Sequence, residues 1–587
     1  MRRRRGPVVL GQLVGLLVAL ALAVSGCVRM PESGPVVETK SGGAVNEQPG
    51  ISIDPRPPQA GASAPDIVKG FLDAMTATPI QTNVAKQFLA KDAQASWNPE
   101  RRTITYSDAS PPRAGHGSSV AVSLSGAHQL DSRGAWRGPL PRSEQVLRFP
   151  MTRENGEERI AAAPNALIVP ETWFEQRFRE VSLYFFDPTA QILVPEPVFV
   201  PLGDQLPTAL VEGLLRGPPP SLARVSRSFI PPGLDYGVSV TVSGTGVADI
   251  ALKGDVGPQT TQAMQLMLAQ FTWTLRQEPS IRAVRISIGG QQIQLPGGVT
   301  EVSVDQGAAF DPTGAQSSSL LYGLRRGLLS SGPSGELDPV AGPLGAERFG
   351  VRSVGVNLDA TQVAAVTDDG RVVLTAPVRG PASDVRQVVS GATDLLRPAW
   401  DFADRLWLVD RAPGGARVSY VEDGHPTSVT VPRVTGTSVR SFLVSRDGSR
   451  FVAVVHHPAG DALMVSRIRH DDQGAVLGAS NARRISWEGG GRLLIRDIGW
   501  RTPTTIAALH VLTGDLSQVR TIEVDGSPPG LDSLSTTLQG RVLSLAASPV
   551  ASESLYAVTR SSLIDLSSPE RGIAPLDPGV TSLGYVG

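Results

Sequence analysis

The sequence predicts a multidomain chain in which two α+β domains are followed by an all-β six-bladed propeller. Three observations lead to this fold class. The 587 residues include 62 glycines and 48 prolines but few aromatic residues, which is typical of turn-rich β structure. The first half alternates amphipathic helical stretches with short strands, and the last third repeats one strand-turn-strand unit.

The N-terminal segment has the three parts of an export signal. Residues 2–5 are arginines, residues 8–24 are mostly apolar, and Ser25 and Gly26 precede Cys27, the only cysteine in the chain. We therefore predict a lipoprotein signal peptide over residues 1–26. The spacing resembles a bacterial lipobox, which implies that Cys27 carries an S-diacylglycerol and an N-acyl chain such as palmitate. The protein would then be anchored to the extracytoplasmic face of the cell membrane without spanning it.

Three alternatives for this segment stay open. The apolar run is at the short end of the roughly 20 residues that a transmembrane helix needs. A cleaved and fully secreted form would make the small-small-Cys ending a coincidence. A twin-arginine export signal is a third reading, although no polar-Arg-Arg-x-apolar pattern follows residues 2–5. The general export route is the simplest interpretation.

Charge and cysteine content exclude some classes of protein. Removing the four arginines at residues 2–5 moves the formal net charge from −1 to −5, which does not suggest a nucleic-acid-binding protein. Because no second cysteine accompanies Cys27, the exported chain must be stable without disulfides. The hydrophobic content of 41% is ample for packed cores.

We predict a flexible tether over residues 27–61, before the first folded domain. This stretch is rich in proline and glycine and lacks an apolar period. Ser63, with Asp66 three residues later, resembles a capping box, and the next apolar residues fall on one helical face. A second helical stretch carries Val84, Phe88 and Leu89, after which β patterning begins. We predict an N-terminal α+β domain over residues 62–176, similar to a nuclear-transport-factor-2-like (NTF2-like) cone.

A second α+β domain is predicted over residues 177–305. Two apolar strands at 183–187 and 193–200 are separated by a turn, and Pro207 opens a helix that ends at Gly217. Further strands are predicted at Val238-Val240-Val242, at 250–252 and at 284–288, with a longer helix around residues 264–275. The order of Tyr-Phe-Asp, Leu-Val-Pro-Glu and Leu-Leu-Arg-Gly-Pro resembles the domain shared with the spore germination protein GerM.

Residues 306–587 repeat a pair of apolar strands joined by a polar turn. The second strands of these pairs recur about every 43 to 54 residues, which suits four-stranded propeller blades. Ser445-Arg446-Asp447-Gly448 is the clearest turn and resembles the Ser-x-Asp-Gly turn of TolB-type propellers. We expect residues 580–586 to pair with residues 320–324 and so close the ring, because a closed ring leaves no exposed sheet edge.

No catalytic motif was recognised, and the chain is predicted not to be an enzyme. The sequence lacks a Gly-x-Ser-x-Gly elbow, a His-Glu-x-x-His motif, paired Cys-x-x-Cys motifs and a phosphate-cradling glycine loop. His456-His457 ends an apolar strand without further ligands at metal-binding spacing. The pairs Asp368-Asp369 and Asp471-Asp472 fall where turns use aspartate to bond the local backbone. We therefore expect no catalytic, metal or cofactor residues.

The order of these parts resembles one family, the actinobacterial LpqB lipoproteins. The lipobox, the tether, the two α+β domains and the propeller follow in the order of that family, and the texts at residues 27–36, 70–75 and 584–587 are similar to it. The resemblance implies a partner, the extracytoplasmic domain of the sensor histidine kinase MtrB. It further implies modulation of the two-component response regulator MtrA in cell-envelope homeostasis.

A different class of function remains open. Propellers also serve as glycan-binding proteins and hydrolases, so the propeller face could act on the cell wall. This alternative needs acidic and aromatic residues gathered at one end of the blades. Trp400, Trp407 and Trp500 are the candidates, and we expect them to pack between blades because they fall within strands.

Overall fold

The computed structural model describes residues 55–587 except 78–79, 116, 204, 238, 258, 487–491, 531–532 and 569–571. The chain divides into two units, residues 1–53 and 54–587, and the account below concerns the second. The predicted signal peptide, Cys27 and most of the predicted tether lie outside the described residues. Within the described residues, no helix combines the length and the apolar character needed to cross a membrane.

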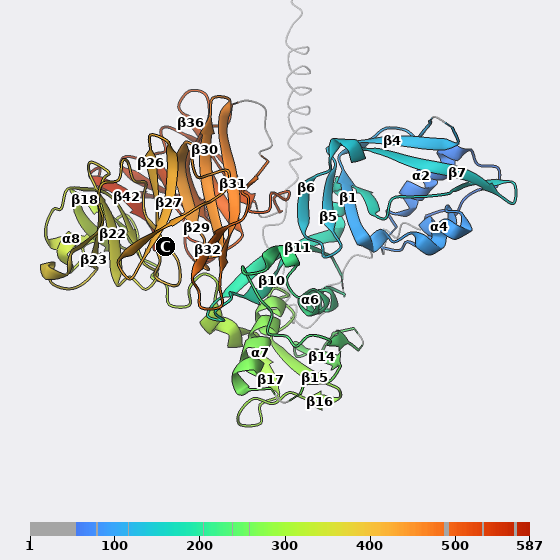
Figure 1. Cartoon of the computed structure of the whole chain (residues 1–587), viewed down its shortest axis with the longest axis horizontal. Coiled ribbons are helices and arrows are strands. Elements are labelled where there is room, and N and C mark those ends of the chain that lie inside the picture. Colours follow the sequence, from blue (N-terminus) through green and yellow to red (C-terminus); the bar gives the residue numbers. More distant parts are fainter. Residues whose placement is uncertain are drawn as a thin grey trace, which may run out of the picture. The chain divides into compact units, whose positions relative to one another are not determined.

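The N-terminal domain packs short helices against two sheets (Figure 1). Helix α2 (Ala64–Ala74) starts as predicted: the Ser63 hydroxyl accepts from the Asp66 amide at 3.4 Å and donates to the Asp66 carboxylate at 2.5 Å. Phe71 on α2 contacts Trp97 and Phe149 in the core, with ring centroids 5.4 and 5.9 Å apart. The domain continues with α3 (Asn83–Gln87), α4 (Lys91–Ser96) and α5 (Glu171–Arg177).

This domain has two sheets, and the long strands of the second one, β4 and β7, alternate buried and more exposed residues, as expected for a sheet with one solvated face. The first sheet has the order β6-β5-β1-β9, and the second has the order β2-β4-β7-β8, with β3 also on β4. The strands are β1 (Arg102–Tyr106), β2 (Asp108–Ala109), β3 (Arg113–Ala114), β4 (Ser119–Ser125), β5 (His128–Asp131), β6 (Trp136–Pro139), β7 (Val146–Glu154), β8 (Glu157–Ile160) and β9 (Leu167–Pro170).

The second domain begins with a long hairpin and continues with a helix-covered sheet. The hairpin pairs β10 (Phe178–Phe186) with β11 (Leu193–Pro201) over nine residue pairs. Strands β14 (Val247–Lys253) and β15 (Ala283–Ile288) are parallel and are joined through helix α7 (Thr261–Leu275). The remaining elements are α6 (Leu206–Leu215), β12 (Asp235–Tyr236), β13 (Thr241–Val242), β16 (Gln291–Gln292), β17 (Glu301–Ser303) and the 3₁₀ helix η4 (Val304–Phe310). Helix η4 packs on α7, although it spans the predicted domain boundary at 305/306.

Two predicted elements of these domains were partly wrong. The helical stretch through Val84, Phe88 and Leu89 is shorter, because Phe88 caps α3 and Leu89 forms a bridge with Ile160. The predicted strand Val238-Val240-Val242 is reduced to the two residues of β13, while Val240 donates its amide to the Thr208 hydroxyl at 3.0 Å instead of to a strand. Residue 238 lies outside the described residues.

The C-terminal domain is the predicted propeller, and its sheets follow one another along the chain (Figure 1). Within the described residues the sheets have the orders β21-β22-β23-β24, β25-β26-β27-β28, β29-β30-β31-β32 with β33, β34-β35-β36-β37 and β38-β39-β40-β41, and β20-β19-β18-β42 combines the two ends of the domain. The first strands of the five consecutive sheets are β21 (Val351–Val356), β25 (Ala399–Trp400), β29 (Val439–Val444), β34 (Ile495–Trp500) and β38 (Ser544–Ala546).

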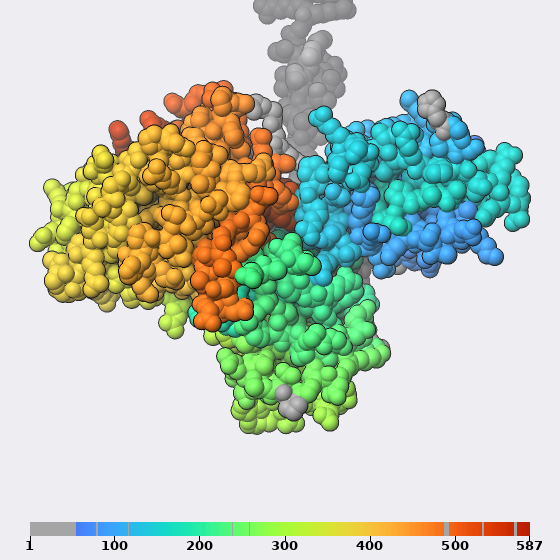
Figure 2. All heavy atoms as spheres, viewed as in Figure 1, coloured from blue at the N-terminus to red at the C-terminus, as the bar shows by residue number. Residues whose placement is uncertain are grey.

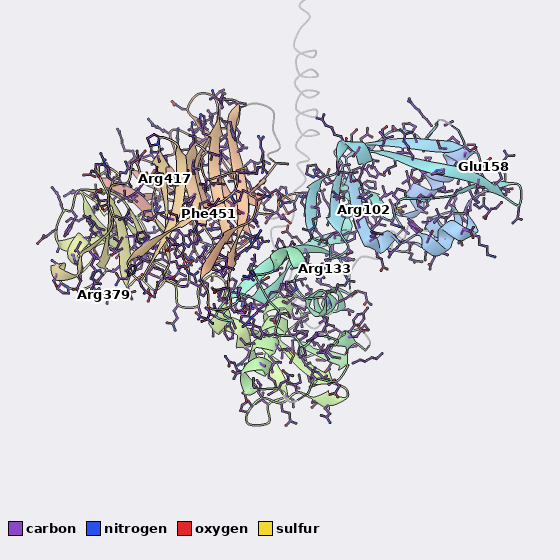
Figure 3. The ribbon with its side chains drawn as sticks, viewed as in Figure 1. Arg102, Arg133, Glu158, Arg379, Arg417 and Phe451 are labelled. Atoms are coloured by element: carbon purple, nitrogen blue, oxygen red, sulfur yellow. The ribbon has the colours of Figure 1, made fainter. Side chains whose placement is uncertain are left out.

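The second strands of these sheets are buried on both faces, which explains their continuous apolar text. Phe451 on β30 (Figure 3) is fully buried among the residues of neighbouring strands. The second strands are β22 (Gln362–Thr367), β26 (Leu406–Ala412), β30 (Arg450–His457), β35 (Thr505–Val511) and β39 (Tyr556–Val558). The outer strands are β23 (Val373–Pro377), β24 (Arg386–Val389), β27 (Gly415–Glu422), β28 (His425–Val429), β31 (Gly460–His470), β32 (Val476–Ala479), β33 (Arg483–Arg484), β36 (Leu516–Glu523), β37 (Ser535–Gln539), β40 (Ser562–Asp565) and β41 (Ile573–Pro575).

The two ends of the propeller domain meet in one sheet, as predicted. Strand β42 (Val580–Gly584) is antiparallel to β18 (Leu321–Arg325), which in turn pairs with β19 (Leu328–Gly332), followed by β20 (Asp338–Pro339). Leu583 and Tyr585 are buried with Leu321 in the core between sheets. The closing strand therefore contributes both ladder hydrogen bonds and core side chains.

Candidate functional site

The sequence-predicted residues with possible chemistry take structural roles. His456 lies at the end of β30, and its ring contacts Asp461 at 2.7 Å. The carboxylates of Asp369 and Asp471 accept from backbone amides two residues further on, at 3.0 and 2.9 Å, as turn aspartates do. Within the described ranges, no three histidine, cysteine, aspartate or glutamate side chains are grouped as a metal site would require.

The three candidate tryptophans, Trp400, Trp407 and Trp500, pack inside the propeller, as predicted, and Trp487 lies outside the described residues. The Trp400 indole donates to the Gly355 carbonyl at 3.0 Å, and Trp500 donates to the Val444 carbonyl at 2.9 Å, so each reaches the innermost strand of the preceding sheet. Trp407 is fully buried and donates to the Asp401 carboxylate at 3.0 Å. These tryptophans therefore hold the sheets together and do not form an exposed aromatic platform.

Three arginines occupy the same structural position in successive sheets, and two of them, Arg352 and Arg496, bond to the next sheet. Arg352, Arg440 and Arg496 are each the extra residue of a β-bulge near the start of an innermost strand. Arg352 donates to the Leu395 carbonyl at 2.6 Å, and Arg496 donates to the Val542 carbonyl. Both carbonyls lie just before the innermost strand of the next sheet. The bulge therefore directs the arginine side chain towards the next blade.

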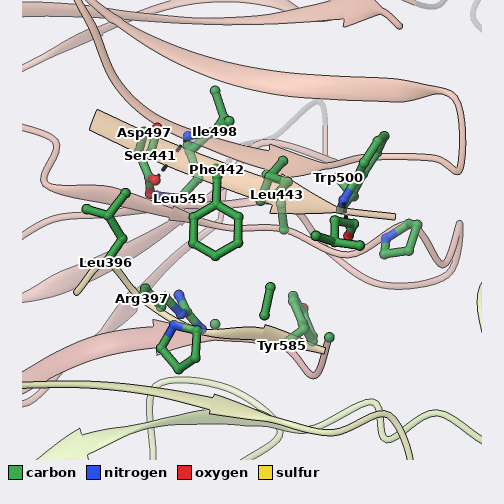
Figure 4. A pocket seen from close by; sticks show the side chains of 18 of the residues that line it. Leu396, Arg397, Ser441, Phe442, Leu443, Asp497, Ile498, Trp500, Leu545 and Tyr585 are labelled. Carbon is green, nitrogen blue, oxygen red and sulfur yellow. Dashed lines mark hydrogen bonds between the residues drawn. The ribbon is translucent and has the colours of Figure 1, made fainter. Parts of the chain in front are cut away.

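The innermost strands surround a cavity of about 310 Å³ (Figure 4). Its wall is formed by β29, β34, the residues leading into β25 and the segment after β42. Arg397 and Tyr585 lie on the wall opposite Asp497 and Ile498, with Phe442 between them. The charged lining residues are Arg397, Arg440, Arg446, Arg496 and Asp497.

The Arg446 side chain closes one side of this cavity and ties it to the chain before the propeller. Its guanidinium donates to the Thr313 and Val586 carbonyls at 2.8 and 2.9 Å and to the Ser317 hydroxyl at 3.0 Å. Burial lowers the pKa of Arg446 to about 10, against the opposing influence of Glu553 and Asp311. Arg446 remains charged at neutral pH.

A second assembly of charged residues joins the hairpin β10-β11 to the propeller. Arg450, which is fully buried at the start of β30, donates to the Pro195 carbonyl on β11 and lies 3.4 Å from the Asp447 carboxylate. Arg467 on β31 forms an ion pair of 2.5 Å with Glu196. The His470 amide donates to the Arg224 carbonyl at 2.7 Å, and Figure 2 shows these orange and green surfaces in contact.

The same hairpin also contacts the N-terminal domain. The Phe199 amide on β11 donates to the Gly134 carbonyl at 2.8 Å, and the Phe199 ring lies 6.0 Å from that of Trp136. Arg133, labelled in Figure 3, donates to the Arg216 carbonyl at the end of α6, 3.1 Å away. The hairpin is therefore shared by all three domains of the described chain.

Three carboxyl groups approach one another where β10 meets the propeller. The Ser527 hydroxyl donates to Glu180 at 3.4 Å, its amide donates to Asp525 at 2.9 Å, and Thr505 donates to Glu523 at 2.9 Å. Burial, with the neighbouring Glu523 charge, raises the pKa of Glu180 to about 9, and burial raises that of Glu523 to about 7. Burial also raises the pKa of Asp525. The charged groups that face this cluster are Arg483, Arg467 and Glu196.

This cluster predicts that stability falls as pH rises. The folded pKa of Glu180 lies above its ordinary value of 4.5, so the folded state binds the proton more tightly than the unfolded state. The contribution is complete at acid pH and is lost as pH rises from about 4.5 towards 9. We expect the melting temperature of the wild type to fall between pH 6 and 9, measured by circular dichroism, and Glu180→Gln to flatten that profile.

An exposed carboxylate supplies the control for this measurement. Glu100 is exposed in the N-terminal domain, and Glu100→Gln should leave the pH profile unchanged. An unchanged slope in Glu180→Gln would show that the cluster does not govern the pH dependence.

Several of these residues were missed by sequence reasoning. Arg397, Asp497, Glu180 and Asp525 carry no motif, because their partners come from distant parts of the chain. The arginines at bulges did leave a signal: Arg352, Arg440 and Arg496 each follow a β-branched residue near the start of an innermost strand. Aligning the repeats on those strands would have found them.

Comparisons with known proteins match the three domains in chain order. The family model "Lipoprotein LpqB, N-terminal domain" matches residues 57–175, "Sporulation and spore germination" matches 182–294, and "Lipoprotein LpqB beta-propeller domain" matches 327–571. Among solved structures, the tandem GerMN domains of the sporulation protein GerM from Bacillus subtilis match with 24% identity and a TM-score of 0.18, over 22% of this chain and 45% of that one.

Two curated relatives match almost from end to end. Lipoprotein LpqB of Cutibacterium acnes is 27% identical over 554 residues, covering 90% of this chain and 92% of the relative. Lipoprotein LpqB of Streptomyces avermitilis is 27% identical over 621 residues, covering 98% and 99%.

The fold and the matched domains define a class, the multidomain lipoproteins that combine a GerM-like domain with a C-terminal β-propeller. Within that class, the chain belongs to the LpqB lipoprotein family. These relatives are named as lipoproteins, which supports a membrane-anchored lipoprotein.

Proposed function

We propose that this protein is a lipid-anchored accessory on the extracytoplasmic face of the cell membrane, which binds the extracytoplasmic domain of the sensor histidine kinase MtrB and modulates two-component signalling. The observation that supports this most directly is the uninterrupted domain order of the LpqB family behind a lipobox cysteine. The kinase partner comes from that family resemblance. The physical basis of the proposal is that the folded domains offer surfaces to which another protein can bind.

Anchoring makes a modest interface sufficient. If the segment predicted as a tether, residues 27–61, behaves as a flexible chain, its root-mean-square span is roughly 30 Å, which would bring a partner in the same membrane within reach. Confinement to one membrane raises the local concentration of the partner, and an affinity that is weak in solution can then give high occupancy.

Cys27→Ser should abolish lipidation. Diacylglycerol addition needs the thiol, and two or more acyl chains are needed for a durable anchor because each buried methylene contributes about 0.8 kcal/mol. We expect an unprocessed or soluble chain, detected by mass spectrometry of the N-terminus and by membrane fractionation. Recovery of a wild-type protein with an unmodified Cys27, or with cleavage elsewhere, would remove the lipoprotein assignment.

The kinase proposal is tested by reconstituting the lipidated protein and full-length MtrB from the same organism in one nanodisc. We expect the autophosphorylation rate of the kinase to change when the lipoprotein is present, and crosslinking to join the two extracytoplasmic parts. Cys27→Ser supplied at the same bulk concentration is the matched control, since it keeps the folded domains and loses co-localisation. An unchanged kinase rate together with no crosslink would refute the accessory role.

The alternative function is cell-wall glycan binding or hydrolysis at the propeller face, and it is tested alongside the kinase experiment. Incubation with peptidoglycan and arabinogalactan fragments measures retention and release of sugar. Turnover or saturable retention, combined with an unchanged kinase, would favour the alternative.

A further inference from the structure

The cavity enclosed by the innermost strands carries an excess of positive charge. Four arginines and a single acidic side chain, that of Asp497, are found among the described residues that line it, and the last residue, Gly587, lies beside them. Arg440 has a carboxylate partner, because its Nε lies 3.3 Å from Asp461. The other three arginines hydrogen-bond neutral oxygens, so their charges are not matched by ion pairs within the wall.

Arg397 is the arginine most available to a ligand. Its Nε donates to the Val354 carbonyl at 3.1 Å, and Nη1 donates to the Leu583 carbonyl at 3.2 Å. Protein surrounds the residue closely enough to lower its pKa, while its side chain remains accessible to water through the cavity. The backbone carbonyls thus hold the guanidinium in a fixed direction without neutralising it.

The single acid of the lining is already occupied. Both oxygens of Asp497 accept backbone amides, from Leu545 at 2.8 Å and from Ile498 at 3.0 Å. Asp497 and Arg397 do not form an ion pair, although the Asp497 charge acts on the Arg397 pKa. The wall therefore contains a fixed cation in a confined, partly desolvated space, where attraction for an anion is stronger than in bulk water.

We propose that this cavity is a binding site for a small organic oxyanion, a carboxylate or phosphate group that Arg397 recognises. The volume of about 310 Å³ has room for a small ligand that carries an apolar portion beside its anionic group. Phe442, Leu443, Leu545 and the face of Tyr585 supply apolar wall for that portion. The site is independent of the kinase proposal, since it lies wholly within the propeller.

The side chains that line the proposed site come from separate sheets, so a bound ligand should also stabilise the propeller. Arg397 precedes β25, Phe442 lies on β29, Ile498 on β34 and Tyr585 follows β42. A bound oxyanion would add a contact between these sheets to those that Arg397 and Arg446 already make with the segment around β42. Its binding should therefore raise the melting temperature in proportion to the logarithm of its concentration above the dissociation constant.

Two probes separate the chemical sources of the oxyanion. Inorganic phosphate supplies the anionic group alone, and benzoate supplies a carboxylate with an apolar ring. Isothermal titration of the full-length lipidated protein should give one binding site for at least one probe, weakened by added salt. Tighter binding of phosphate assigns the site to phosphoryl ligands, and tighter binding of benzoate assigns it to carboxylates with an apolar body.

Arg397→Met should weaken binding of the preferred probe about tenfold or more, since a charge-assisted contact is lost while the apolar stem is kept. The matched control is Arg417→Met, which removes an exposed arginine from the same domain (Figure 3). Asp497→Asn should tighten binding, because it removes the only acidic side chain among the described lining residues.

A measurement on the wild type guards against misfolded variants. Phenylglyoxal modifies accessible guanidinium groups, and peptide mapping reports the modification of Arg397 and Arg417 separately. The probe should slow modification of Arg397 and leave Arg417 unaffected. Absence of binding by both probes in the wild type, or protection of the two arginines to the same degree, would overturn the proposal.

Discussion

A chain that ends at Val580 should lose much of the stability of the propeller. The deletion removes most of β42 from its ladder with β18 and takes away Leu583, Tyr585 and Val586, all buried. Each such side chain contributes about 1.5–3 kcal/mol, so we expect a loss of about 5 kcal/mol or more and a melting temperature about 10 °C lower. Differential scanning calorimetry of the two chains measures the difference.

The deletion also removes a hydrogen-bond partner from each of three other groups. Arg446 loses the Val586 carbonyl, Arg397 loses the Leu583 carbonyl and the Val354 amide loses the Ser582 hydroxyl. Ile573→Ala is the control, because Ile573 is 71% exposed on β41 of the adjacent sheet and its truncation should change little. Equal melting temperatures for the truncated and complete chains would show that β42 does not hold the ring closed.

Arg450→Ala should loosen the attachment of the hairpin β10-β11 to the propeller. The change removes a fully buried cation that bonds Pro195 on the hairpin and the Ser449 hydroxyl at 3.1 Å, and it leaves the buried Asp447 charge without this partner. Removing one member of a buried ion pair costs about 3–5 kcal/mol. We expect a lower melting temperature and faster amide hydrogen exchange along β10 and β11.

Two further variants define what Arg450 contributes. Arg450→Lys keeps the charge but not the forked geometry, so we expect partial recovery of stability. Arg417→Ala removes an exposed arginine of the same domain and should alter neither readout. Hydrogen exchange in the hairpin that stays at the wild-type rate in Arg450→Ala would contradict the role assigned to this residue.

The sequence predicts the elements of this protein better than its site, and particular residues explain why. Helix α2 was predicted from Ser63 and Asp66, which cap it locally. The turn at Ser445 to Gly448 was predicted from its Ser-x-Asp-Gly pattern, and in the structure Asp447 accepts the nearby Ser449 amide at 2.8 Å. Both signals depend on residues within one turn of each other. The predicted strand around Val240 was shortened, since its amide is bonded by Thr208, some 30 residues away.

The junction and the cavity depend on contacts that no local pattern encodes. Burial and the nearby Glu523 charge raise the pKa of Glu180. The Arg397 guanidinium is oriented by the carbonyl of Leu583, a residue 186 positions later in the chain. Such pairs become neighbours only after the domains fold. The family could be assigned from the order of the domains along the sequence. The positive charge of the cavity, in contrast, became apparent only in the structure.

The pairing of β18 with β42 also sets the order of events when the chain folds. The first of these strands is synthesised about 250 residues before the second, so the ring cannot close until nearly the whole propeller has been made. Until then β18 and the intermediate sheets present open edges, which other chains could pair with. A holding chaperone or slow release during export would protect the incomplete propeller from pairing with other chains. The yield of folded protein would then depend on the competition between ring closure and aggregation more than on the free energy of unfolding of the complete propeller.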